Sequence, residues 1–211
     1  MQLSVTAILL NYKRPSNIPR IVADLREAGC AEVWCWDNSC TRDLWPRSGV
    51  LFDRYHPSES NAGCSPRWGW AGEVDTDFTL VMDDDLTLSH DGVLISATQG
   101  SIKRGQACIG AYGRRLDPAR SYGKCPLVRA GRADILLGRF ILMPRDQARK
   151  VGDCPEKFED DIYANSKFTA AKVVMPGLTI DLNPGASKWA VCKRPGHYQA
   201  REDARRRYFK K

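Results

Sequence analysis

An apolar run that ends in three consecutive acids is the feature that most constrains the fold. Residues 78–82 have the composition of a buried strand, and Asp83, Asp84 and Asp85 follow them directly. Adjacent carboxylates repel one another, so a cation, hydrogen-bond donors or water must compensate them. Because side chains alternate along a strand, we expect Asp83 and Asp85 on one face and Asp84 on the other. Such oxygen ligands suit Mg²⁺ or Mn²⁺ together with substrate phosphates, and a solvated acidic turn is the alternative.

The start of the chain predicts a strand, a loop and a helix. Residues 3–10 are aliphatic and β-branched, as expected for a strand that is buried on both faces. A polar segment at 11–15 follows, and Ser16 or Asn17 can cap a helix with apolar residues at helical spacing that stops at Gly29. This pattern predicts a layered α/β domain.

Two further strands, at residues 32–36 and 50–55, also lead into polar residues. Ligands of open parallel sheets bind at the carboxyl edge of the strands, so side chains there are candidates for holding a nucleotide. An ordinary turn at residues 37–38 is the alternative. The candidates are Tyr12, Arg14, Asp37 and Asn38.

The segment before the acidic strand predicts an anion-binding loop. Asn61 and Gly63 suit a tight turn, Ser65 and Pro66 suit the start of a helix, and Arg67 then lies in its first turn. Backbone N–H groups and a guanidinium near one point would bind a diphosphate. A capped structural helix is the alternative.

The order of these motifs resembles the GT-A class of nucleotide-sugar glycosyltransferases, with residues 83–85 as a DxD-type motif. Residues 158–165 resemble the Asp-Asp-Ile-x-x-Asn segment of the exostosin-like members of that class. The resemblance implies an α/β fold: a GT-A (Rossmann-like) mixed sheet flanked by helices in a single compact domain. Residues 1–182 would form the catalytic domain, and residues 183–211 a donor-closing loop and basic C-terminal tail of the same domain.

The resemblance also implies roles for individual residues. Asp83 and Asp85 would hold Mn²⁺ or Mg²⁺ at the donor diphosphate, with His197 as a third ligand or as an ordinary surface histidine. Asp160 and Asp161 would be catalytic, with Asp161 accepting the acceptor proton or balancing positive charge at the sugar carbon. The alternative is that both acids complement a helix N-terminus. The implied donor-binding residues, for a UDP-sugar such as UDP-glucose, are Asn11, Tyr12, Arg14, Asp37, Asn38, Asn61, Arg67, Asp84 and Lys193.

Basic residues are concentrated in the last half of the chain. Acceptor or diphosphate contacts are expected from a group in the middle segment, although each of its arginines alone could simply be solvated. Residues 199–211 are rich in arginine and lysine around Tyr208 and Phe209, which suits contact with phosphates or a solvated end. The acceptor candidates are Arg114, Arg132, Asp134 and Arg139.

Charge and composition bear on the partner. The 32 basic and 25 acidic residues leave a net charge of +7, which favours polyanionic partners. The eight cysteines contain no CxxC pair, so we expect reduced thiols. With neither a secretory signal nor an apolar run long enough for a membrane span, the expected location is the cytoplasm, that of the host if the protein is phage-encoded.

A small, basic GT-A domain also resembles the TET/JBP-associated glycosyltransferases of phages and kinetoplastids, which modify hydroxymethylated pyrimidines in DNA. The shared features are size, the loop at residues 11–14, the acidic triplet and the stretch 132–139. The implied acceptor is a 5-hydroxymethylpyrimidine in DNA, bound through the basic surface. The alternatives are a glycosyltransferase acting on a cell-envelope saccharide or small molecule, and a non-catalytic nucleotide- or DNA-binding protein.

Overall fold

The computed structural model describes residues 3–41, 43–44, 48–182 and 191–209. Its strands are β1 (Val5–Asn11), β2 (Glu32–Asp37), β3 (Arg54–Pro57), β4 (Phe78–Asp83), β5 (Leu86–Leu88), β6 (Cys108–Gly110), β7 (Gly113–Arg114), β8 (Leu127–Val128), β9 (Gly131–Arg132), β10 (Ile135–Leu136), β11 (Phe140–Pro144), β12 (Lys172–Val174) and β13 (Thr179–Asp181). Its helices are α1 (Ile18–Glu27), α2 (Ser48–Leu51), α3 (Pro66–Glu73), α4 (Val93–Ile102), α5 (Arg145–Val151), α6 (Asp160–Lys167) and α7 (His197–Tyr208), with 3₁₀ turns η2 (Tyr122–Lys124) and η3 (Val191–Lys193).

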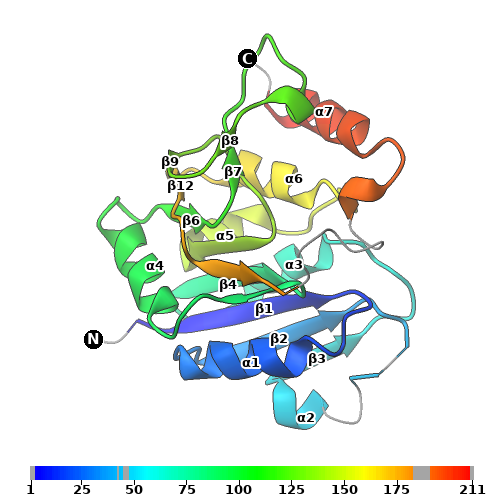
Figure 1. The fold of residues 1–211 in the computed structure, drawn as a ribbon, viewed down its shortest axis with the longest axis vertical. Coiled ribbons are helices and arrows are strands. Elements are labelled where there is room, and N and C mark those ends of the chain that lie inside the picture. Colours follow the sequence, from blue (N-terminus) through cyan, green and yellow to red (C-terminus); the bar gives the residue numbers. More distant parts are fainter. Residues whose placement is uncertain (1–2, 42, 45–47, 183–190, 210–211) are drawn as a thin grey trace.

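An eight-stranded mixed sheet organises the fold, in the order β3-β2-β1-β4-β11-β6-β12-β9 (Figure 1). Strands β3, β2, β1 and β4 are parallel, and β11 runs antiparallel to β4. The carboxyl ends of β1, β2 and β4 therefore meet at one edge. The expected α/β fold with a mixed sheet in a single domain is confirmed.

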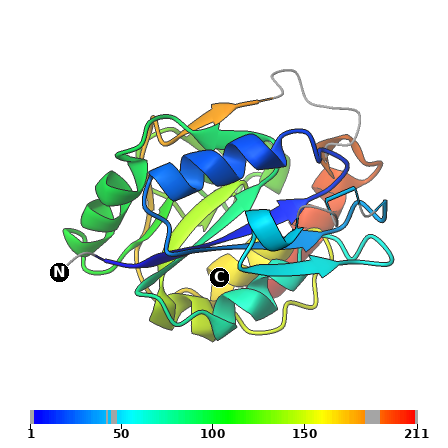
Figure 2. The same cartoon turned by 90° about the horizontal axis from the view of Figure 1, so that it is seen from below.

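Helices cover both faces of this sheet (Figure 2). On one face, apolar residues of α1 and α4 pack against those of β1 and β4 in one buried cluster. On the other face, α3, α5 and α6 contribute to a second cluster with Ile8 and Val81 at its centre. Burial on both faces explains why β1 and β4 are nearly continuous apolar runs.

Several local expectations are confirmed and one is wrong. Strands β1 and β2 and helices α1, α3 and α6 begin within two residues of their predicted starts. The third strand is not at 50–55: residues 48–51 form α2, and β3 begins at Arg54, which pairs with Trp34 of β2. Val50 is 91% exposed, so the apolar character of this segment does not reflect a buried strand.

The C-terminal part of the chain differs from the expected loop and tail. Residues 197–208 form α7, which contacts α6 and η2. Residues 183–190, most of the predicted donor-closing loop, lie outside the described residues. All eight cysteines are free thiols. No helix in the described part of the chain is both long enough and apolar enough to cross a bilayer.

Candidate functional site

A cavity of about 390 Å³ lies at the carboxyl ends of β1 and β4 and reaches the first residues of α6 and α7. Its volume is within the range of small-molecule sites. The predicted site residues that line it are Tyr12, Arg14, Arg67, Asp83, Asp84, Asp85, Arg114, Arg139, Asp160, Asp161 and His197. Those that do not line it are Asn11, Asp37, Asn38, Asn61, Arg132, Asp134 and Lys193.

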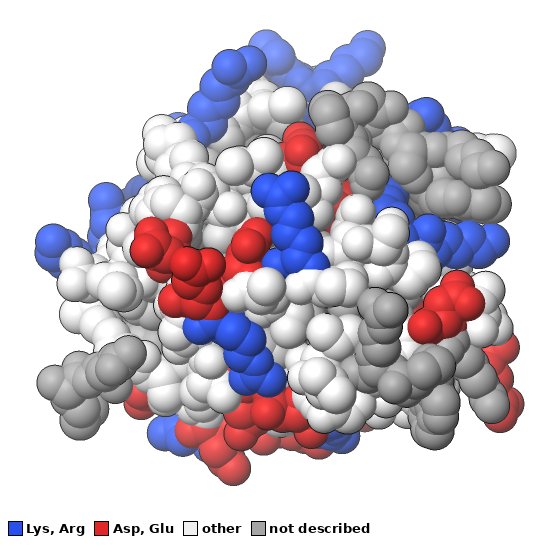
Figure 3. All heavy atoms as spheres, turned by 60° about the horizontal axis from the view of Figure 1, so that its bottom comes forward, with Lys and Arg blue, Asp and Glu red and all other residues white. Residues whose placement is uncertain are grey.

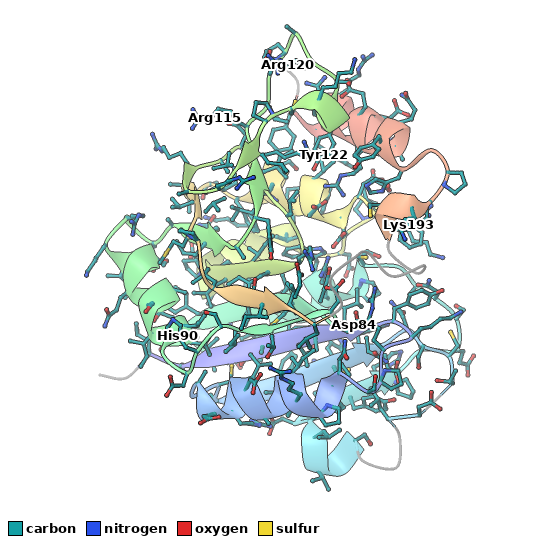
Figure 4. All side chains as sticks on the ribbon, viewed as in Figure 1. Asp84, His90, Arg115, Arg120, Tyr122 and Lys193 are labelled. Carbon is teal, nitrogen blue, oxygen red and sulfur yellow. The ribbon has the colours of Figure 1, made fainter. Side chains whose placement is uncertain are left out.

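The acidic triplet divides as the strand alternation predicts. Asp83 accepts a hydrogen bond from Arg67 Nη1 at 2.8 Å, and Asp85 lies 3.2 Å from Arg139 Nη2. Asp84 turns the other way, where it accepts the Tyr12 backbone N–H at 2.6 Å and Arg14 Nη1 at 2.5 Å. These two hydrogen bonds hold the loop that follows β1 against Asp84, which lies just after β4 (Figure 4).

Burial changes the acid strength of this triplet. It raises the pKa of Asp83 to about 6, a rise that the Asp85 charge reinforces and Arg67 and Arg139 oppose. Burial also raises the pKa of Asp84 to about 7, although Arg14 opposes the shift. Arginines therefore supply the positive charge that three adjacent acids require.

Asp83 and Asp85 fit a divalent metal. Their side chains are 30% and 23% exposed, so both can meet an entering cation, and hard carboxylate oxygens suit Mn²⁺ or Mg²⁺ with phosphates as the other ligands. Within the described ranges, no three His, Cys, Asp or Glu side chains cluster as metal ligands. His197 lines the same cavity as the pair, and its role as a third ligand stays a prediction. Its pKa is lowered by burial and by the charges of Arg201, Arg194 and Arg114.

Arg67 is the buried centre of the site. Its guanidinium donates to Asp160 from Nε at 3.0 Å and Nη2 at 2.8 Å, to Asp83, and to the Gly138 carbonyl at 2.9 Å. Trp68 Nε1 also donates to Asp160 at 2.6 Å. Asp160 thus accepts three hydrogen bonds and holds Arg67 beside Asp83, and its catalytic role stays a prediction.

Asp161 is held by residues that the sequence analysis did not single out. Arg201 Nη2 donates to its two carboxylate oxygens at 2.8 and 2.7 Å, and to the Tyr122 hydroxyl at 2.7 Å. The Gly138 N–H lies 3.3 Å from Asp161 Oδ2. Figure 4 shows Tyr122, the first residue of η2, beside α7. Arg201, Ala204 and Tyr208 recur at helical spacing, and this pattern could have predicted a helix that packs one face against the domain.

Asp37 and Asn38 have internal partners. Asp37 accepts hydrogen bonds from Asn11 Nδ2 and the Tyr55 hydroxyl, both at 2.7 Å. Asn38 Nδ2 donates to the Gly63 carbonyl at 2.6 Å. The Asn61 side chain in turn accepts the Gly63 N–H at 2.8 Å. These residues order the loops beside the cavity, and their direct contact with a donor stays a prediction.

The acceptor candidates separate into two pairs. Arg114 faces the cavity with its guanidinium 5.0 Å from the Tyr122 ring centre, and Arg139 faces it beside Asp85. Arg132 is exposed on β9, and Asp134 accepts the Leu116 N–H at 2.7 Å. Lys193, which was predicted to bind the donor, is exposed in η3.

The arginines of α7 are paired rather than free. Glu202 accepts Arg205 Nη2 at 2.6 Å and Arg206 Nε at 2.7 Å, and Arg207 pairs with Glu156. Hydrogen bonds from Arg205 and then Arg206 lower the pKa of Glu202 to about 2. The segment that was expected to be a solvated or phosphate-binding tail is therefore a helix packed against α6 and η2, and its Arg201 and Glu202 are buried.

Gly138→Ala tests the packing between Arg67 and Asp161. A Cβ at Gly138 would lie 2.6 Å from Arg67 Nη2, and Arg67 cannot easily move because three acceptors hold it. We expect a loss of about 1–3 kcal/mol in the free energy of unfolding, measured in urea. Gly72→Ala in α3, whose Cβ meets nothing within 4 Å, should instead be neutral or stabilising by about 0.5–1 kcal/mol. Equal stability of the two variants would contradict this account.

The sheet order, the acidic end of β4 and the acidic start of α6 around one cavity define the GT-A type of glycosyltransferase fold. The mannosyltransferase PcManGT from Pyrobaculum calidifontis, solved with GDP-Man and Mn²⁺, matches with a TM-score of 0.64 and 15% identity over 99% of this chain and 62% of its own. TarS from S. aureus matches with a TM-score of 0.56 and 12% identity over 84% of this chain and 36% of its own. This chain thus spans less than two thirds of either protein. Neither a protein-family model nor a curated protein matches the sequence.

Proposed function

We propose that this chain is a metal-dependent glycosyltransferase that moves a sugar from a nucleoside-diphosphate sugar to a hydroxyl acceptor. The observation that carries the proposal is that Asp83 and Asp85, at the end of β4 and just after it, line the same cavity as Asp161 of α6. The GDP-Man and Mn²⁺ bound by PcManGT agree with a metal and a nucleotide-sugar donor. The expected donor class here includes UDP-sugars such as UDP-glucose.

In the reaction, the bond from the sugar carbon to the donor diphosphate breaks and a bond to the acceptor oxygen forms. A metal held by Asp83 and Asp85 would supply positive charge for the departing diphosphate. Arg14, Arg67 and Arg139 lie beside those acids and add preorganised positive charge of this chain's own. This charge favours departure of the leaving group.

Asp161 would act at the other end of the transfer. Its orientation is fixed by Arg201 and Gly138, so it can face the reacting carbon or the acceptor hydroxyl without reorganising. It would take the hydroxyl proton in an inverting reaction or balance positive charge at the sugar carbon in a retaining one. The exostosin-like segment at residues 158–165 motivates this role.

Asp85→Asn tests the metal assignment. The amide keeps the shape of the side chain but is a weaker ligand for a hard cation, so metal-dependent donor hydrolysis should fall at least about 10-fold. The matched control is Asp181→Asn, because Asp181 also pairs with Arg139 but lies outside the triplet. Mn²⁺ titration of donor binding by calorimetry should show a weaker Kd for Asp85→Asn only. Equal metal dependence in both variants would contradict the assignment.

For the acceptor, we propose a 5-hydroxymethylpyrimidine in DNA. The support is the group of basic residues in the segment 113–132, beside the cavity. Mass spectrometry of nucleosides from hydroxymethylated DNA, incubated with the protein, Mn²⁺ and a panel of nucleotide sugars, should show a hexose-sized gain. Donor hydrolysis without any DNA product would favour a cell-envelope saccharide or small-molecule acceptor. Donor binding without hydrolysis would favour a non-catalytic binding protein.

A further inference from the structure

The segment 113–132, which we call the basic lobe, extends from the edge of the sheet at β9 toward α7 (Figure 1). It comprises β7, η2, β8 and the edge strand β9, and it lies beside α7 (Figure 1). Its contacts with α7 are buried: the Tyr122 N–H donates to Glu202 at 2.8 Å, and the Tyr122 hydroxyl accepts from Arg201. Since Arg201 also holds Asp161, the basic lobe is joined directly to the candidate catalytic residue.

The basic lobe carries most of the net charge of the chain. It contains six basic residues and one acid, a net +5 out of +7. The one acid, Asp117, pairs with Arg120 at 3.0 Å. Four basic side chains are exposed and pair with no acid in the described part of the chain: Arg115, Lys124, Arg129 and Arg132. By contrast, acidic and basic side chains are interspersed on the face shown in Figure 3.

Two neighbouring arginines connect the cavity with this outer surface. Arg114 faces the cavity, where Nη1 donates to the Cys125 carbonyl at 2.5 Å and the guanidinium lies over Tyr122. Arg115 is exposed and points away, as Figure 4 shows, and its Nη2 donates to the Arg132 carbonyl at 3.0 Å. Arg115, directly after β7, is therefore joined to the backbone of β9 at Arg132, whereas its neighbour Arg114 faces the cavity.

We propose that the basic lobe binds the phosphodiester backbone of a nucleic acid and so holds the acceptor at the mouth of the cavity. Three of its four unpaired cations are arginines, whose guanidinium groups match phosphate geometry. Exposed cations without acid partners release counterions when they meet phosphates, whereas the paired arginines of α7 are already compensated. The inference rests on the proposed function, because it assigns a surface to the proposed DNA acceptor.

The test compares two fourfold glutamine variants that remove the same charge. The lobe variant changes Arg115, Lys124, Arg129 and Arg132, and the control changes Lys103, Arg104, Arg149 and Lys150 on and beside α4 and α5. Fluorescence anisotropy with a labelled DNA duplex is measured from about 50 to about 200 mM salt. For the lobe variant, the log–log salt slope should fall by about 3.6, or about 0.9 for each contact, and the affinity at the lowest salt by at least about 100-fold. The control should stay within about threefold of the parent.

Three results would overturn the inference: absence of DNA binding by the parent at low salt, equal losses in the two fourfold variants, or a lobe variant that loses binding to anionic lipid vesicles but keeps DNA binding. Acceptor-free donor hydrolysis is measured in parallel, and both variants should retain it. A parent that binds DNA through the basic lobe but hydrolyses no donor would contradict the proposed function and leave the surface assignment standing.

Discussion

Asp161→Asn is expected to lower turnover by at least about 100-fold, the lower end of what a positioned acid–base group contributes. The amide nearly preserves the shape of the carboxylate, but it can neither take a proton nor balance positive charge. Donor affinity should change little, because Asp83, Asp85 and the nearby arginines remain. Single-turnover kinetics with a nucleotide sugar, together with donor titration, separates the two effects.

The same substitution also leaves Arg201 buried without its partner. Removing one member of a buried ion pair costs about 3–5 kcal/mol in the free energy of unfolding. Arg201→Met should cost a similar amount, because it leaves Asp161 uncompensated. The double variant should be less destabilised than the sum of the two singles, measured by urea unfolding at one temperature. Turnover of Asp161→Asn within a few-fold of the parent would remove Asp161 from the chemistry, and additive destabilisation would show that the pair is not coupled.

Arg67→Met is expected to destabilise the protein about as strongly as loss of the Asp161–Arg201 pair. Arg67 is 2% exposed and compensates both Asp160 and Asp83, so its loss leaves the buried Asp160 and the half-buried Asp83 without this cation. We expect a loss of about 3–5 kcal/mol in the free energy of unfolding and no measurable donor hydrolysis in the folded fraction. Urea unfolding followed by tryptophan fluorescence gives the first value.

Arg149→Met is the matched control for Arg67→Met. Arg149 also pairs with a carboxylate, that of Asp75 at 3.0 Å, but these side chains are 51% and 90% exposed. An exposed pair contributes about 0–1 kcal/mol because water and salt screen it. Similar destabilisation by the two substitutions would mean that burial of the Arg67 cluster does not determine its strength.

Local sequence patterns predicted much of the framework. Continuous apolar runs identified β1 and β4, because strands that are buried on both faces exclude polar residues. Pro66 after Ser65 located the start of α3, and the acidic pair at 160–161 located the start of α6. The alternation of residues 83–85 predicted that Asp84 would point away from Asp83, toward the loop after β1.

Polar residues at the strand ends were harder to assign. Asn17 occupies the N-cap position of α1 but makes no capping bond; its side chain donates to the Asp84 carbonyl instead. Asp37 ends a strand, as a ligand-binding acid would, yet its carboxylate accepts hydrogen bonds from Asn11 and Tyr55. A pattern can indicate that a polar group lies at an edge, but the choice among its possible partners depends on residues distant in sequence.

The sequence by itself determined which acids follow buried strands and which acids begin a helix, because both follow from burial and from local backbone geometry. Only the tertiary structure decided how the charges pair. Asp161 meets Arg201 from 40 positions away, and Arg67 meets Asp160 from 93. Charged partners are selected by the three-dimensional distance between them and by the burial of both, and neither quantity is encoded in spacing along the chain. For the same reason, the arginines of α7 have acidic partners within the described part of the chain, whereas four exposed cations of the basic lobe have none there.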